Sequence, residues 1–160
     1  MKGRRYPLGL QTFERIIKGN YVYVDKTELI YNLTHESTYC FLSRPRRFGK
    51  SLLVTTLQAY FQGKKELFKG LAIDSLETEW TAYPVLHFDI SKGKYYSLAN
   101  LMSTLNVVIS PYERLYGLTP DKSDDFNVRI INIIQAAKQQ TGKNVVVLID
   151  EYDAPLLDVV

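Results

Sequence analysis

Apolar residues in the first part of the chain recur at intervals that predict two helices and a short strand. Apolar side chains at helical spacing predict a helix over 11–18, and Gly19 suits the end of that helix. The run 21–24 is typical of a short strand. A second helix is predicted over 27–33, with Thr27 able to cap its first turn.

A buried strand, a loop and a longer helix are predicted next. The run 39–42 is short, apolar and rich in aromatic residues, which predicts a buried strand in which Cys40 is a small core residue. From Lys50 to Phe61 the apolar spacing is helical, and Gly63 marks the end of the helix. The order of these elements is therefore strand, loop and helix.

The second half of the chain continues the alternation. The run 84–90 predicts a strand, with Pro84 at its start, where a missing N–H does least harm. Apolar residues at helical spacing then predict a helix over 98–110. Pro111 should end this helix, because proline interrupts the helical hydrogen bonds.

A last helix and a last strand complete the pattern. Asp124 or Asp125 can cap a helix that ends near Gly142. The run 145–149 consists of valine, leucine and isoleucine, which is typical of a strand buried on both faces. Alternating strands and helices predict an α/β fold with a mainly parallel sheet.

Composition and length indicate one globular domain in the cytoplasm. The 160 residues are 46% apolar and 23% charged, and the longest aliphatic run is far shorter than the roughly 20 residues of a membrane-spanning helix. The basic N-terminus lacks the apolar stretch of a secretory signal. Cys40 is the single cysteine, and no cysteine and histidine cluster has zinc-ligand spacing. We therefore expect a reducing compartment, no membrane association and no structural metal.

The net charge of +3 conceals an asymmetry between the two halves of the chain. Residues 1–70 hold 13 Lys/Arg and 5 Asp/Glu, whereas residues 71–160 hold 7 and 12. This distribution fits either an arm that binds nucleic acid or a basic cluster around one bound polyanion. The second interpretation is favoured by four cations of one short loop, namely Arg44, Arg46, Arg47 and Lys50. Other lysines fit a solvated surface, namely Lys64, Lys65 and Lys69.

The segment 43–51 lies between a predicted strand and a predicted helix, as a phosphate-binding loop must. Gly49 permits close approach of the backbone to an anion, and the N–H groups at the start of the helix favour negative charge. Lys50 would then reach the β- and γ-phosphates. The Ser51 hydroxyl would bind Mg²⁺, which accepts few protein oxygens and keeps several waters.

This loop departs from the general G-x-x-x-x-G-K-[ST] pattern. The first glycine of the pattern would fall at Arg44, and the neighbouring Pro45 has no N–H. A basic strand-to-helix turn that binds nothing in particular is the alternative for this segment by itself.

Two acids follow the last predicted strand and support the nucleotide interpretation. Burial of an unpaired carboxylate is costly, and a neighbouring Mg²⁺ would offset that cost. Asp150 would hold the metal through water, and Glu151 could polarise a water for attack on the γ-phosphorus. The alternative is a strand end at which acids meet solvent.

With both segments in place, the chain resembles the bacterial AAA-ATPase-like family, whose members commonly carry a PD-(D/E)XK nuclease-like domain after the ATPase domain. An Arg-Pro-Arg-Arg-Phe stretch before Gly-Lys-Ser is usual in that family, so the missing first glycine matches it. The resemblance covers nearly the whole chain and is carried by 23–27, 41–51, 59–61 with 64–68, and 148–153.

The resemblance implies a P-loop NTPase fold with ATP and Mg²⁺ as ligands. Lys50 and Glu151 are then the catalytic residues, and Ser51 and Asp150 hold the metal. The implied nucleotide contacts are Asp25, Arg46, Arg47, Phe48, Gly49, Lys50, Ser51 and Leu52. Asp25 would lie toward the adenine, although an ordinary cap at the start of the following helix is an equal alternative.

The same resemblance implies that the sheet is incomplete in this chain. In such ATPases a strand with a polar sensor residue lies between the two strands that carry the loop and the acids, and here it would follow residue 160. We expect 1–36 to form an N-terminal extension and 37–160 the nucleotide-binding core. A nuclease-like domain outside the chain, nucleic acid and a second copy of the chain are the expected partners.

Four functions remain open at this point. The leading hypothesis is the nucleotide-binding part of an ATPase that drives or gates a nucleic-acid-acting domain. The alternative is a nucleotide-dependent signalling switch that touches no nucleic acid, and DNA-stimulated turnover would separate the two. A small-molecule kinase is disfavoured because an acid pair that activates water is present. A binding module without catalysis is disfavoured by Glu151.

Overall fold

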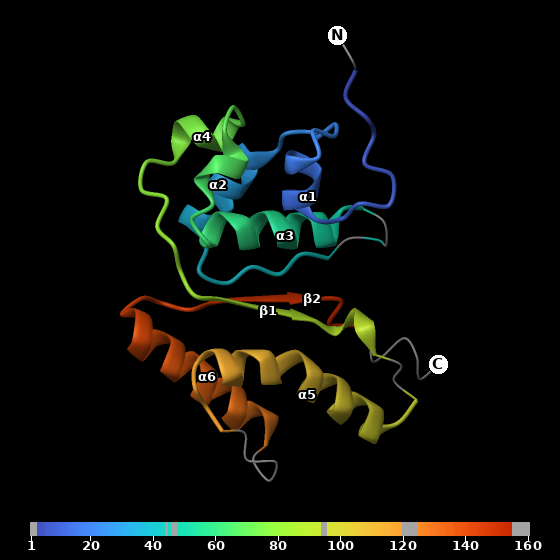
Figure 1. Ribbon diagram of the computed structural model, residues 1–160, viewed down its shortest axis with the longest axis vertical. Helices are drawn as coiled ribbons and strands as arrows, with labels where there is room; N and C mark the ends of the chain where they lie inside the picture. Colours follow the sequence, from blue (N-terminus) through green and yellow to red (C-terminus); the bar gives the residue numbers. More distant parts are fainter. Residues whose placement is uncertain (1–2, 44, 46–47, 94–95, 120–124, 155–160) are drawn as a thin grey trace. The chain divides into compact units, whose positions relative to one another are not determined.

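The computed structural model describes residues 3–43, 45, 48–93, 96–119 and 125–154, which divide into two units at residues 82 and 83 (Figure 1). The first unit is helical. Its elements are α1 (Phe13–Lys18), α2 (Thr27–Glu36), α3 (Lys50–Phe61), a 3-10 helix η1 (Lys65–Phe68) and α4 (Ala72–Leu76). The second unit is α/β. Its elements are β1 (Val85–Asp89), a 3-10 helix η2 (Ile90–Lys92), α5 (Leu98–Leu115), α6 (Phe126–Thr141) and β2 (Val146–Asp150).

An aromatic core holds the first unit together. The Phe13 and Phe68 rings lie 4.8 Å apart between centroids, and Trp80 packs 5.2 Å from Phe68. Phe13 comes from α1 and Phe68 from η1, so these contacts join short helices that would be marginal in isolation. The other buried apolar members of this core are Ile30, Ala59, Tyr60, Leu67 and Ile73.

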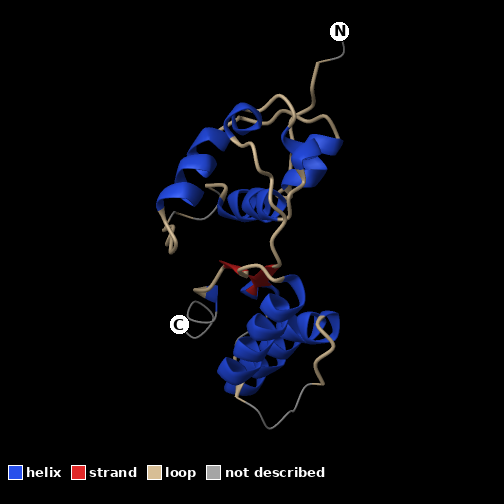
Figure 2. Ribbon diagram, turned by 90° about the vertical axis from the view of Figure 1, so that its left-hand side faces the viewer, coloured by secondary structure: helices blue, strands red, loops and turns tan. Residues whose placement is uncertain are grey.

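The second unit is built on two parallel strands that carry α5 and α6 (Figure 2). Leu86 and Phe88 on β1 pack with Ile109 of α5 and Ile133 of α6. The Tyr112 hydroxyl of α5 accepts a hydrogen bond from the His87 N–H at 2.8 Å and donates one to the His87 carbonyl at 2.9 Å. These contacts fix α5 against β1.

A buried ion pair joins the two helices of this unit. The Arg129 guanidinium of α6 donates two hydrogen bonds of 2.8 Å to the Glu113 carboxylate of α5 and one of 2.5 Å to Asn106. Both ionised side chains are almost fully buried, at 5% and 3% exposed. Bidentate geometry and the additional amide satisfy the charges that burial would otherwise penalise.

Several element predictions are confirmed. The helix at 50–61 has the predicted bounds, and Gly142 ends α6 in the left-handed conformation at φ 66°. Asp125 occupies the N-cap position of α6, although its side chain makes no capping hydrogen bond, and Asp124 lies outside the described residues. The predicted parallel pairing is confirmed by the two-stranded sheet.

The two predicted strands of the first unit are wrong. At 21–24 an isolated bridge between Arg5 and Tyr21 replaces a strand. No strand is assigned among the described residues of 39–42, where Tyr39 is 94% and Phe41 71% exposed. Cys40 is exposed instead of lying in the core. An extended segment becomes a strand only when another strand pairs with it, and no strand of the described part of this unit does so.

Helix α5 does not stop at Pro111 as predicted, and it continues to Leu115. Proline removes the hydrogen bond to the carbonyl four residues earlier, but packing on both sides of Pro111 holds the helix together. Ile109 is buried in the core before it, and Tyr112 bonds to β1 after it.

Burial of the last strand on both faces is also wrong. Val147 is 39% and Ile149 53% exposed. The two residues pair with Leu86 and Phe88 of β1, so they share the face on which the helices pack. Since α5 packs against β1, the side chains of β2 on that face reach solvent.

Within the described residues, no helix is both long and apolar enough to cross a membrane.

Candidate nucleotide-binding site

The start of α3 carries the predicted phosphate contacts on consecutive positions. Gly49 precedes the helix in the left-handed conformation at φ 77°, and a side chain built there would meet no atom within 4 Å. A glycine at this position therefore satisfies the backbone conformation rather than relieving a clash. Lys50 and Ser51 then form the first helical residues.

The N–H groups at a helix start point toward the position where an anion binds. Gly49, the N-cap residue, has no side chain to cap this helix, and the first turn contains no acidic residue. The Leu53 N–H donates a hydrogen bond to the Gly49 carbonyl at 3.0 Å and closes the first turn of the helix. The Leu52 side chain packs against the core of the first unit, so only its backbone can face a ligand. Phe48 is exposed.

The loop before Gly49 carries three further cations. Arg44, Arg46 and Arg47 lie outside the described residues, so their predicted contacts with phosphate remain predictions.

Asp25 connects two helix starts in the first unit. Its Oδ1 accepts hydrogen bonds from the Thr27 N–H at 2.9 Å and the Thr27 hydroxyl at 2.7 Å, and its Oδ2 accepts one from the Ala72 N–H at 2.7 Å. Burial raises the pKa of this carboxyl, but these hydrogen bonds outweigh burial and lower the pKa below its ordinary value. Thr27 is fully buried and accepts a bond from the Ile73 N–H at 3.0 Å. Asp25, rather than the Thr27 hydroxyl, therefore caps α2.

Two acids end the parallel strands of the second unit at the same register position. Asp89 ends β1 and pairs with Asp150, which ends β2 and is 7% exposed. The Asp150 Oδ1 accepts a hydrogen bond from the Glu151 N–H at 3.0 Å. The Asp89 Oδ1 accepts bonds from the Ser91 N–H at 3.0 Å and the Ser91 hydroxyl at 2.6 Å. Ligands of parallel sheets bind at this carboxyl edge.

The chain turns sharply directly after β2. Glu151 has φ 53°, a left-handed conformation that is unusual for a residue with a side chain. Such strain persists where surrounding contacts enforce it and is common at functional sites. Asp153, two residues later, has a buried Oδ1 without a hydrogen-bond partner in the described part of the chain. The strand end thus carries several carboxylates rather than the predicted pair.

Sequence reasoning missed Asp89 and Asp153. Asp89 is an acid at the end of a predicted strand, as Asp150 is, and that shared position was the available signal. The register of the two strands was needed to bring Asp89 opposite Asp150. Among the described residues, no group of three or more His, Cys, Asp or Glu side chains has the arrangement of a metal-binding cluster.

Comparisons with known proteins place the chain in a family. A family model described as "Predicted AAA-ATPase" matches residues 7–160. The chain is 37% identical over 160 residues to a protein of Azotobacter chroococcum mcd 1 described as "Uncharacterized protein in vnfD 5'region". That alignment covers 99% of this chain and 31% of the relative. No solved structure matches. The chain belongs to the predicted AAA-ATPase family.

Proposed function

We propose that this chain contains the nucleotide-binding part of a Mg²⁺-dependent ATPase. The observation that carries the proposal is the start of α3, where a left-handed glycine, Gly49, is followed by Lys50 and Ser51 in a first turn without an acidic residue. An anion placed there meets several N–H donors and the positive end of the helix dipole. Membership of a family described as predicted AAA-ATPases supports triphosphate as that anion.

The residues at this position suit both ligands. Lys50 contributes a cation for the β- and γ-phosphates, and the Ser51 hydroxyl contributes one oxygen for Mg²⁺. The first turn of α3 contains no carboxylate that would repel phosphate. We assign Arg46, Arg47, Phe48, Gly49 and Leu52 to the same phosphate-contacting segment, with Leu52 acting through its backbone.

The acids after β2 supply the remaining functions in this proposal. Asp150 holds the Mg²⁺ ion through water. The buried Oδ1 of Asp153, which has no hydrogen-bond partner among the described residues, fits a cation. Bound Mg²⁺ neutralises charge that develops on the phosphates. Glu151 accepts a proton from the attacking water, and its strained backbone holds its position directly after the strand.

We further propose that nucleotide turnover is coupled to a downstream domain that acts on nucleic acid. The chain spans 31% of the length of its Azotobacter relative, which leaves room in that protein for further domains. The resemblance stated above supports this coupling, because members of that family commonly carry a nuclease-like domain after the ATPase domain.

Phosphate release from Mg²⁺-ATP tests this function in the full-length protein. The measurement is made with and without double-stranded DNA, and with EDTA as the metal-free control. Hydrolysis that requires Mg²⁺ and increases with DNA is the expected result. Absence of hydrolysis would contradict the ATPase assignment, and hydrolysis that DNA leaves unchanged would contradict the coupling and favour a nucleotide-dependent switch.

A further inference from the structure

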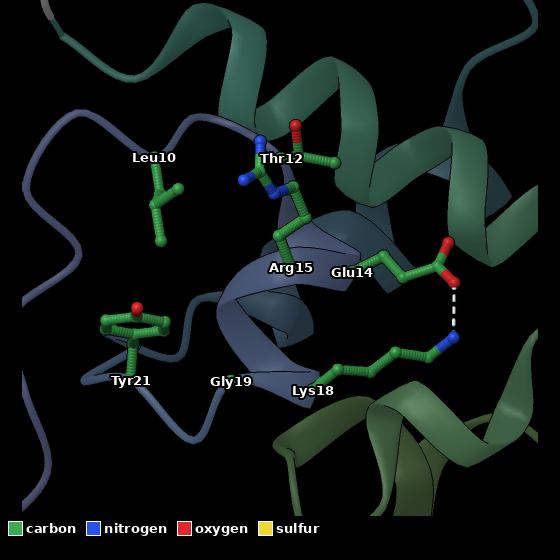
Figure 3. A pocket seen from close by; sticks show the side chains of 7 residues that line it. All are labelled: Leu10, Thr12, Glu14, Arg15, Lys18, Gly19 and Tyr21. Atoms are coloured by element: carbon green, nitrogen blue, oxygen red, sulfur yellow. Dashed lines mark hydrogen bonds and ion pairs between the residues drawn. The ribbon is translucent and has the colours of Figure 1, made fainter.

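A cavity of about 520 Å³ lies beside α1 in the first unit (Figure 3). Its two ends are contributed by segments that flank the helix, Leu10 before it and Tyr21 after it. The residues that line the cavity are Leu10, Thr12, Glu14, Arg15, Lys18, Gly19 and Tyr21. The mechanism proposed above uses none of them.

Gly19 leaves the space that the Tyr21 ring occupies. A Cβ atom built on Gly19 would lie 2.4 Å from the ring, far closer than any van der Waals contact, so only glycine leaves room for the ring there. The ring and the Leu10 side chain face each other across the cavity (Figure 3). A planar, apolar group fits between an aromatic ring and an aliphatic side chain.

Arg15 is the cation of the cavity that remains available for a ligand. Lys18 is paired with Glu14 at 2.6 Å, and the same carboxylate binds Lys64 at 2.8 Å. The Arg15 guanidinium is exposed and makes no hydrogen bond or ion pair with any side chain among the described residues. Its N–H groups can donate to the ring nitrogens of a nucleobase or to ribose oxygens.

Helix α1, beside which the cavity lies, packs against α3. The Phe13 N–H donates to the Thr55 hydroxyl at 3.1 Å, and that hydroxyl donates to the Gln11 carbonyl at 3.1 Å. Thr55 is five residues beyond Lys50, so the helix rise places this contact about 7.5 Å along the axis from the helix start. The chain on either side of Thr12 thus contacts α3 within two turns of the proposed phosphate position.

We propose that this cavity holds the nucleoside end of ATP, with the base against Tyr21 and Arg15 as its polar contact. The proposal rests on the proposed function, because it assumes that phosphates bind at Lys50. It assigns the base to a different place from Asp25, whose carboxylate oxygens already accept three hydrogen bonds from Thr27 and Ala72.

Calorimetric titration of the full-length protein with Mg²⁺-ATP and with Mg²⁺-tripolyphosphate separates the two ends of the ligand. Tyr21→Ala and Arg15→Ala should each weaken ATP binding roughly tenfold, since loss of one base–aromatic stack has about that effect. Tripolyphosphate has no base, so its affinity should not change. Tyr21→Phe keeps the ring and should bind ATP as the parent does. Tyr96→Ala, which removes an exposed tyrosine of the second unit, is the matched control.

The outcomes distinguish this proposal from the proposed function. If Lys50→Ala weakens the binding of ATP and of tripolyphosphate, and Tyr21→Ala weakens the binding of ATP alone, the phosphate site and the cavity assignment are both supported. If Lys50→Ala weakens the binding of ATP and of tripolyphosphate, but Tyr21→Ala and Arg15→Ala bind ATP as the parent does, the cavity assignment alone is overturned. Equal weakening of ATP and tripolyphosphate in Tyr21→Ala also overturns it. Unchanged binding in Lys50→Ala overturns the phosphate site itself.

Discussion

Asp89 and Asp150 end neighbouring parallel strands at the same register position, so two carboxylates meet at the carboxyl edge of one small sheet. Asp89 is engaged by Ser91, whereas Asp150 is buried and bonds to the N–H of the residue that follows it. We expect different consequences when each carboxylate is neutralised. Asp150 is the proposed metal ligand, and Asp89 serves as a local cap.

The first prediction concerns Asp150. Asp150→Asn keeps an oxygen to accept the Glu151 N–H but removes the charge that holds Mg²⁺, so ATP affinity should lose most of its dependence on Mg²⁺. Titration of ATP in the presence of Mg²⁺ or EDTA measures this effect. Asp89→Asn is the matched control and should retain the full Mg²⁺ dependence. An undiminished Mg²⁺ effect in Asp150→Asn would remove Asp150 from the metal site.

The second prediction concerns Lys50. Charge-assisted contacts to phosphate contribute about 1.5–3 kcal/mol, so Lys50→Ala should weaken ATP binding roughly ten- to a hundredfold. Lys69→Ala removes an exposed lysine of the same unit and should have little effect. Equal affinities of these two variants by calorimetry would contradict the role of α3.

The third prediction concerns the buried pair of the second unit. Glu113→Ala leaves the Arg129 charge buried without its partner and should destabilise the protein by about 3–5 kcal/mol. The double variant Glu113→Leu/Arg129→Met removes both charges and should recover most of that loss. Denaturant unfolding measures both values. A double variant no more stable than Glu113→Ala would show that packing, rather than the unpaired charge, causes the loss.

The fourth prediction concerns pH. Hydrogen bonds from Lys18 and then Lys64 lower the pKa of Glu14 from 4.5 to about 2. Because this pKa is lower in the folded state, the contribution of the ionised Glu14 carboxylate to stability is complete above pH 4.5 and is lost as the pH falls toward 2. Glu14→Gln should therefore have a lower melting temperature than the parent at pH 7. The difference between the two melting temperatures should become smaller at pH 2–3. Melting temperatures across this range that stay equally far apart would refute the assignment.

The helices were easier to predict than the strands. Apolar spacing defined α3 and Gly63 marked its end, because helical hydrogen bonds are local. The segment at 39–42 has the composition of a strand, but a strand requires a partner, and composition does not reveal one. Pro111 lies inside α5 because tertiary packing outweighs a local break.

In the candidate site, too, features that depend on neighbouring residues could be predicted, and those that depend on distant contacts could not. Gly49, Lys50 and Ser51 are contiguous in sequence, so their shared helix start could be predicted from the residues alone. Asp89 could not be assigned, because its position opposite Asp150 depends on which strands pair and in what register. The cavity of Tyr21 depends on a contact with Gly19 that only the folded chain reveals.

We expect Glu151 to activate water for ATP hydrolysis, and Glu151→Gln tests this role. The amide keeps the size of the side chain but cannot accept the proton, so turnover should fall a hundredfold or more at roughly parental ATP affinity. Phosphate release and ATP titration are measured on the same full-length preparation. Hydrolysis by Glu151→Gln at the parent rate would contradict the account.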